Sequence, residues 1–266
     1  MHLTNKYLAV ILNRNMGEVC DDLRKKLLTE GIADVIVVDS STDKILQSKF
    51  VTIGSMDQEA KDIGYRINRG FNLGLNFALR NYTFDWIFCF PVDTEILKFD
   101  LELFDSISKQ FPKIKAYALP ENNDPYLPLI KNKIGLVWNV PEGPILLSQE
   151  LVSMFKTTQN VSLFSDENFR SYLSFKELAF RIYSANFALG IFDGFLVAEN
   201  EELLLTYSEL MKTEDFSLNK KLLISEGEEW LFKKYGIFDR WAFENILRLI
   251  YEEFCKVNPE HKSIEI

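Results

Sequence analysis

Two acidic side chains, Asp93 and Glu95, follow directly after an apolar run at residues 86–90. Such a run predicts a buried strand, and open α/β sheets bind their ligands at the carboxyl ends of the strands. Carboxylate oxygens are the ligands that Mg²⁺ and Mn²⁺ prefer, often together with the phosphates of a substrate. Alternation along an extended segment would place both acids on one side. The sequence therefore predicts a divalent-metal site at Asp93, with Glu95 as the second candidate ligand.

Polar side chains also follow two earlier apolar runs, at residues 7–12 and 34–38. Asn13 and Arg14 come after the first run, and Asp39 comes after the second. Polar residues at successive strand ends are expected where a sheet binds its ligand. For Asp39 and the hydroxyl residues after it, the alternative is an ordinary turn that is rich in local side-chain hydrogen bonds.

The spacing of apolar residues predicts the elements that position these side chains. Strand, helix and strand follow one another from the start of the chain, which indicates a βαβ unit with a parallel sheet. The expected strands are residues 7–12, 34–38, 50–53, 86–90, 115–119, 134–140 and 145–147. The expected helices are residues 17–30, a helix from about residue 68, residues 97–111 and a last helix capped by Asp239. Residues 121–128 and parts of 200–222 are expected to be loops, and residues 58–66 a loop or a short helix. The fold class is α/β, with a mixed, mostly parallel sheet flanked by helices.

Composition limits the classes of partner. The chain has 266 residues, of which 47% are hydrophobic and 14% aromatic, so it can bury a core. Its formal net charge of −9 argues against double-stranded nucleic acid as the main partner, because phosphate binding needs clustered Lys and Arg. The sequence also contains no polybasic segment for an anionic membrane.

The cysteines and histidines exclude two further kinds of site. Cys20, Cys89 and Cys255 are scattered without a C-x-x-C pair, which is typical of free thiols in a reducing compartment. The histidines are His2 and His261, so a zinc site or a His-based catalytic triad is not expected. Because the chain shows neither a signal-peptide layout nor an apolar run of about 20 residues, we expect a soluble cytoplasmic protein.

The stretch before the acidic site carries a spaced motif, Asn68-x-Gly70-Phe71-x-x-Gly74-x-Asn76, at the start of an expected helix. This motif, followed by an apolar strand that ends in Pro-Val-Asp, resembles the family 2 glycosyltransferases of the GT-A fold, in particular their rhamnosyltransferase-like branch. Those enzymes carry an N-x-G-F-x-x-G-x-N element and a strand that ends in Asn-Pro-Asp or Asp-x-Asp. The resemblance extends, with gaps, from about residue 8 to residue 181.

A second segment of the resemblance lies at residues 166–181. The resembled enzymes show D-E-x-F-F-x-Y-x-E-D-x-D-L-x-x-R at this place. The positions that match in register are Asp166, Glu167, Phe169, Tyr172, Leu178 and Arg181, and Glu177 matches conservatively. The Glu-Asp pair of the family, whose Asp is the usual catalytic base, is replaced by Ser174 and Phe175.

The resemblance implies a metal-assisted, inverting hexosyl transfer from a nucleotide sugar to a saccharide acceptor, which in this family is often lipid-linked. It implies Mn²⁺ or Mg²⁺ as the cofactor, and peripheral membrane contact remains an alternative for the last helix. The residues that the resemblance assigns to the nucleotide sugar are Asn13, Arg14, Asp39, Asn68, Arg69, Asn76 and Asp93. Glu199 is an alternative oxygen ligand in place of a family histidine that is absent here.

The missing Glu-Asp pair leaves the catalytic base to another residue. If residues 174–181 are helical, Glu177 lies near Ser174 on the same face, so we expect Glu177 to act as the base, with Asp166 as a second catalytic candidate. The alternative for Glu177 is a structural ion pair with Arg181, four residues further on.

Two further readings of the function stay open. The first is a degenerate GT-A protein that binds a nucleotide sugar or a glycan without turnover. The second is another nucleotide-using α/β enzyme, such as a nucleotidyltransferase, although residues 13–17 are a poor version of the Gly-rich loop that it would need. The expected organisation is a GT-A domain at residues 1–225 and a helical extension at 226–266 that packs on the same domain.

Overall fold

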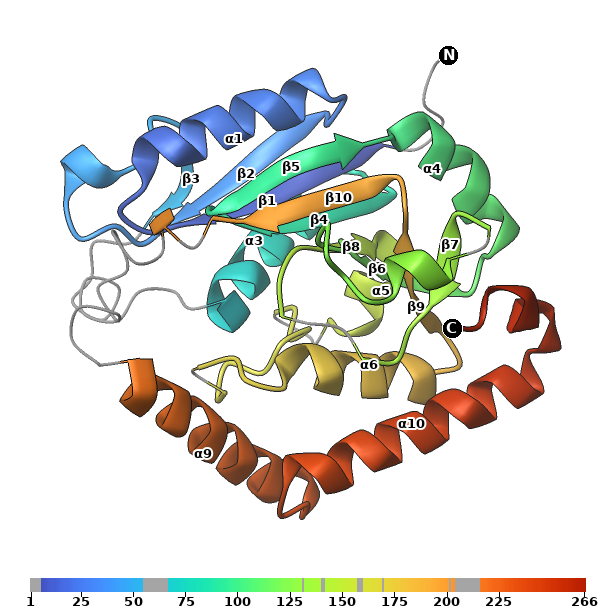
Figure 1. Cartoon of the computed structure of the whole chain (residues 1–266). Coiled ribbons are helices and arrows are strands. Elements are labelled where there is room, and N and C mark those ends of the chain that lie inside the picture. The colour runs from blue at the N-terminus through green and yellow to red at the C-terminus, as the bar shows by residue number, and fades with distance from the viewer. Residues whose placement is uncertain are drawn as a thin grey trace.

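The computed structural model describes residues 6–54, 67–130, 132–139, 142–156, 160–168, 170–200, 202–203 and 216–266, without the side chains of 216–220. The expected loop or short helix at residues 58–66 and most of residues 200–222 lie outside this part of the chain. Figure 1 shows an α/β architecture in which helices cover both faces of a central sheet.

The central sheet has eight strands in the order β3-β2-β1-β4-β8-β6-β9-β7. The strands are β1 (Tyr7–Asn13), β2 (Asp34–Asp39), β3 (Val51–Gly54), β4 (Trp86–Pro91), β6 (Ile114–Ala118), β7 (Ile134–Leu136), β8 (Ile145–Ser148) and β9 (Ala188–Phe192). Strands β1 to β4 pair in parallel, as does β6 with β9, whereas β8 and β7 run antiparallel to their neighbours. The expected βαβ unit and mostly parallel sheet are confirmed.

The helices are α1 (Gly17–Thr29), α3 (Ile67–Asn81), α4 (Leu101–Ile107), α5 (Gln149–Met154), α6 (Ser174–Ser184), α9 (Phe216–Tyr235) and α10 (Arg240–Val257). Helix α1 covers one face of the sheet, whereas α3 and α6 lie on the other face (Figure 1). Gly74 lets α3 approach β1 closely, because a Cβ at this position would lie 2.4 Å from a methyl group of Val10. The glycine of the spaced motif therefore serves helix-to-sheet packing.

A separate two-stranded ribbon joins β5 (Thr94–Phe99) to β10 (Phe195–Glu199) in antiparallel pairing. The expected helix at residues 97–111 is wrong at its start, because residues 97–99 belong to β5 and α4 begins only at Leu101. Pairing with β10, which is remote in sequence, holds this segment in an extended conformation. The ribbon therefore starts and ends beside the turn that follows β4.

The last two helices form a V on the outer side of α6 (Figure 1). The helix cap expected at Asp239 is present, because its side chain accepts a hydrogen bond from the backbone N–H of Ala242 at 2.8 Å. Phe243, Leu247 and Phe254 form the buried stripe of α10. Helix α9 crosses the expected domain boundary at residues 225 and 226. Within the described residues, no helix is long and apolar enough to span a membrane.

Candidate active site

The carboxyl ends of β1, β2, β4 and β6 meet at one edge of the sheet, where the antiparallel strand β8 begins. Leu119, just past β6, donates a backbone hydrogen bond to the carbonyl of Pro144 at 3.1 Å. The segment that leads into β8 therefore lies between the end of β4 and the end of β6. This edge collects the side chains that the sequence places at strand ends.

Asn13 and Asp39 lie side by side at this edge, and both are fully buried. The Asn13 amide donates a hydrogen bond to the Asp39 carboxylate at 2.7 Å. Asp39 also accepts hydrogen bonds from the backbone N–H groups of Ser41 at 2.9 Å and Ser48 at 3.0 Å. The local hydrogen bonding expected of an ordinary turn is therefore present, and the contact of Asp39 with a nucleoside stays a prediction.

Arg14 is partly buried beside this loop, where its guanidinium donates to the backbone carbonyl of Ser40 at 2.6 Å. Asn15 has a left-handed backbone, with φ of 63°, and its side chain accepts a hydrogen bond from the backbone N–H of Thr42 at 2.8 Å. The ends of β1 and β2 are thus tied together by side chains of both strands. Arg14 adds the positive charge that a diphosphate would need here.

Asp93 lies in the two-residue turn between β4 and β5 and is only 6% exposed. Burial raises the pKa of its carboxyl group above the usual range, and the backbone N–H of Asn200 donates to its carbonyl at 3.0 Å. Glu95 is exposed on β5. The expected alternation between the two acids does not apply, because a turn rather than a continuous strand precedes Glu95. Glu199, at the end of β10, pairs opposite Thr94 and so ends beside this turn.

The metal that the resemblance implies can be tested against these residues. Among the described residues, no group of three or more His, Cys, Asp or Glu side chains is arranged to hold a metal ion. Mg²⁺ can nevertheless bind through one or two carboxylates when substrate phosphates and water complete its coordination. The buried Asp93, with Glu199 on the neighbouring strand, fits that sparse kind of site.

Three asparagines on α3, spaced four residues apart, hold the segment that precedes α6. Asn72 donates to the carbonyl of Phe164 at 2.8 Å and to the Asp166 carboxylate at 2.7 Å, while its own carbonyl accepts from the Phe164 N–H at 3.1 Å. Asn76 accepts a hydrogen bond from the Val161 N–H at 2.7 Å. Asn68 completes the row one turn earlier. The family motif leaves the position of Asn72 unspecified, so the motif does not indicate this residue, although its i, i+4 spacing from Asn68 and Asn76 does.

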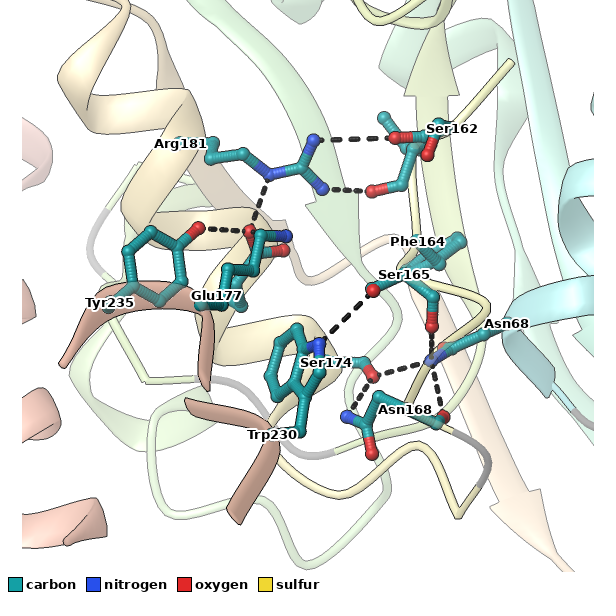
Figure 2. A network of polar contacts seen from close by, with 12 residues as sticks. Asn68, Ser162, Phe164, Ser165, Asn168, Ser174, Glu177, Arg181, Trp230 and Tyr235 are labelled. Atoms are coloured by element: carbon teal, nitrogen blue, oxygen red, sulfur yellow. Dashed lines mark hydrogen bonds and ion pairs between the residues drawn. The ribbon is translucent and has the colours of Figure 1, made fainter. Parts of the chain in front are cut away.

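Asn68 stands at the centre of a polar network that reaches the start of α6 (Figure 2). Its amide donates to the carbonyl of Ser165 at 2.8 Å, the carbonyl of Asn168 at 3.0 Å and the hydroxyl of Ser174 at 2.8 Å. Arg69, beside it, is partly buried. The contacts of Asn68, Arg69 and Asn76 with a nucleotide sugar stay predictions, and the contacts seen for the two asparagines support the segment before α6.

Neither residue in place of the family's Glu-Asp pair can take a proton. Ser174 is 1% exposed, and its hydroxyl accepts hydrogen bonds from the amides of Asn68 and Asn168. Phe175 is also 1% exposed and packs against Phe164, with ring centroids 5.2 Å apart. In place of the usual base, the chain thus has a buried phenylalanine and a serine whose hydroxyl is already hydrogen-bonded.

Glu177 lies at the centre of an ion-pair cluster that joins α6 to α9 (Figure 2). Its Oε1 lies 2.9 Å from the Arg181 Nε, 2.9 Å from the Lys234 Nζ and 2.5 Å from the hydroxyl of Tyr235. Its Oε2 is buried and has no hydrogen-bond partner among the described residues. The pairing with Arg181 that was the structural alternative is present. A catalytic role of Glu177 stays a prediction, and both carboxylate oxygens are turned away from solvent.

Solved structures with a similar fold include a mannosyltransferase and a synthase, each in complex with a nucleotide sugar. One is a mannosyltransferase from Pyrobaculum calidifontis in complex with GDP-Man and Mn²⁺, with a TM-score of 0.53 at 12% identity, covering 98% of this chain and 73% of that one. Another is glucosyl-3-phosphoglycerate synthase from Mycobacterium tuberculosis in complex with Mn²⁺, UDP-Glc and glycerol 3-phosphate, with a TM-score of 0.50 at 14% identity, covering 89% and 82%. No protein-family model and no curated protein matches the sequence. The chain has the GT-A fold, as the sequence predicts.

Proposed function

We propose that the protein is an inverting glycosyltransferase that moves a hexose from a nucleotide sugar to a saccharide hydroxyl. The observation that supports this most is the edge of the GT-A sheet, where Asn13 and Asp39 end strands β1 and β2, and Arg14 and Asp93 lie just past strand ends. Ligands of open α/β sheets bind at this kind of edge. The family 2 and rhamnosyltransferase-like assignment rests on the N-x-G-F-x-x-G-x-N motif and belongs to the same proposal.

In this proposal, Arg14 and Asn13 lie near the diphosphate, and Asp39 accepts hydrogen bonds from the base or the ribose. Asn68, Arg69 and Asn76 lie towards the nucleotide sugar, and Asp166 is the second catalytic candidate. Asp93 holds the divalent metal, with Glu95 or Glu199 as the second carboxylate. When bound, the metal ion would neutralise the charge that develops on the leaving diphosphate.

The direct test is a thermal-shift screen of the full chain with UDP, GDP, dTDP and CMP, each with and without Mn²⁺. A ligand that binds only the folded state increases the free energy of unfolding and so raises the melting temperature. At a ligand concentration of 100 times its Kd, the free energy of unfolding increases by about 2.7 kcal/mol. We expect one nucleoside diphosphate to raise the melting temperature more with Mn²⁺ than without. Transfer is then measured with the matching sugar nucleotides and a panel of saccharide acceptors. No shift with any nucleotide would refute the proposal.

A binder without turnover is the second candidate, because Ser174 and Phe175 replace the family's Glu-Asp pair. It predicts a thermal shift with a nucleotide sugar but no release of nucleoside diphosphate with any acceptor or with water. Steady release of nucleoside diphosphate by the wild-type chain would exclude it.

A further inference from the structure

The segment that enters β8 lies at the same edge as the Asp93 turn. Strand β8 runs antiparallel to β4, with Ile145 opposite Cys89 as the last pair at this end. Pro144, the residue before β8, accepts a hydrogen bond at its carbonyl from the backbone N–H of Leu119, just past the end of β6. Glu142, two residues before Pro144, therefore lies at the carboxyl edge of the parallel strands, the edge that also carries Asp93.

Glu142 also reaches the start of α6. Its carboxylate accepts hydrogen bonds from the backbone N–H groups of Leu173 and Ser174. Leu173 has a left-handed backbone, with φ of 67°, directly before the helix. Successive N–H groups around such a residue form a concave anion site, and a buried leucine adopts this conformation only when its surroundings impose it. The carboxylate is thus held at the chain position where the resembled enzymes carry their Glu-Asp pair.

We propose, on the basis of the function proposed above, that Glu142 is the general base that replaces the missing pair. Its carboxylate takes the proton of the acceptor hydroxyl. The oxygen of that hydroxyl forms a bond to the anomeric carbon while the bond from this carbon to the diphosphate breaks. The nucleoside diphosphate leaves with the bonding electron pair.

The surroundings of Glu142 suit this role better than those of Glu177. Glu142 is exposed, so an acceptor can reach it, yet protein surrounds its carboxylate closely enough for burial to raise its pKa to about 7. The backbone hydrogen bonds and the positive charge of Lys176 on α6 oppose that rise. A base is most effective when its pKa lies near the working pH.

The test compares Glu142→Gln with the wild-type chain, using the donor found in the thermal-shift screen. Glutamine keeps a carbonyl oxygen for the N–H groups of Leu173 and Ser174 but takes no proton at neutral pH. We expect kcat to fall by about 100-fold or more, within the usual range for loss of a general base, while the Kd for the nucleoside diphosphate stays within about twofold. Glu150→Gln is the matched control, since Glu150 lies near the opposite end of β8 and pairs with Lys115 at the surface.

The pH dependence gives a second readout. Because the base works only when ionised, wild-type kcat should rise with pH through about 7, and this rise should be absent in Glu142→Gln. Wild-type kcat in Glu142→Gln, or an unchanged pH profile, would overturn the base assignment while leaving the proposed function intact. A wild-type chain that binds the nucleotide without any turnover would overturn it as well. If no nucleotide binds, the proposed function itself fails.

Discussion

At the scale of single residues, the buried carboxyl group of Asp93 lowers the stability of the fold when it is ionised, and the ionised form is the one that can bind a metal ion. Its burial in the turn after β4 raises its carboxyl pKa, so the ionised form is less stable in the folded chain than in the unfolded chain. A group with a raised folded pKa adds stability at low pH and loses it as the pH rises through that pKa. At neutral pH the carboxylate therefore disfavours folding until a cation binds it.

The first prediction follows from this cost. Asp93→Asn removes the charge and should abolish the Mn²⁺-dependent part of the nucleotide thermal shift, while the melting temperature without ligand stays equal or rises. Glu95→Gln is the comparison variant, because Glu95 is exposed and should matter less. Unchanged Mn²⁺-dependent affinity in Asp93→Asn would remove Asp93 from the metal site.

Glu177 differs from Asp93 because its charge is compensated. Arg181, Lys234 and the hydroxyl of Tyr235 all contact its Oε1. Burial and the charge of Glu177 raise the Tyr235 pKa well above its usual range, so the phenol stays protonated and donates its hydrogen bond. One carboxylate thus ties α9 to α6.

The second prediction is that Glu177→Gln acts on stability. We expect a loss of roughly 1–3 kcal/mol, below the range for a fully buried pair because the Lys234 side chain is 34% exposed. Urea unfolding measures this loss, and nucleotide affinity should not change. Glu229→Gln, which breaks the surface pair with Lys233, is the control and should have no measurable effect. Full stability together with a large loss of kcat would instead support Glu177 as the base.

At the scale of elements, the three asparagines of α3 hydrogen-bond through their side chains to the backbone of the segment before α6. Asn72 is 4% exposed and satisfies both the N–H and the carbonyl of Phe164. Buried backbone groups of an irregular segment need such partners. The segment around residues 161–168 therefore depends on one face of α3 for its shape.

The third prediction concerns this face. Asn72→Ala leaves the backbone groups of Phe164 and the Asp166 carboxylate without their Asn72 partner, and should cost about 1–3 kcal/mol. Thermal unfolding checks the cost. Asn81→Ala, at the exposed end of the same helix, should have little effect because the Asn81 amide donates to the Phe77 carbonyl of its own helix. Equal losses in both variants would contradict the proposed support.

The sequence predicted those helices and strands whose conformation depends on residues close by in the chain. The βαβ unit, the start of α3 and the Asp239 cap follow from apolar spacing and capping chemistry. Strand β5 was not predicted, because its extended form depends on β10, which is remote in sequence.

The same distinction holds for the candidate site. The ends of the apolar runs predicted Asn13, Asp39 and Asp93 as candidate site residues. The spacing of four residues also predicted the ion pair of Glu177 with Arg181. Glu142 could not be found in this way, because only the sheet register and the fold of the chain bring it to the start of α6.

At the scale of the whole molecule, a second apolar cluster joins α9 and α10 to the main body. It consists of Leu173, Trp230, Leu231 and Phe243, and the Trp230 indole also donates to the hydroxyl of Ser165 at 3.1 Å. Leu173 is the residue that precedes α6 with a left-handed backbone. The helical extension therefore packs directly against the segment that presents Glu142 with its hydrogen-bond donors.

The fourth prediction tests this coupling. Phe243 is fully buried, so Phe243→Ala should cost about 3–5 kcal/mol and lower the temperature of a single cooperative transition. Calorimetry checks it. Phe238→Ala is the control, because Phe238 is 78% exposed and should change the transition only slightly. Two separate transitions in Phe243→Ala would show that the extension unfolds independently of the sheet.

The ribbon of β5 and β10 also determines when during synthesis the candidate site can form. Strands β1 to β4 come early in the chain and pair with one another, so this half of the sheet can assemble as the chain leaves the ribosome. The turn at Asp93, however, is held by the backbone of Asn200 and lies beside the pair of Thr94 with Glu199. A nascent chain stalled before residue 195 would therefore lack the β10 side of this turn, and nucleotide binding should appear only after the ribosome has released the segment that contains Asn200.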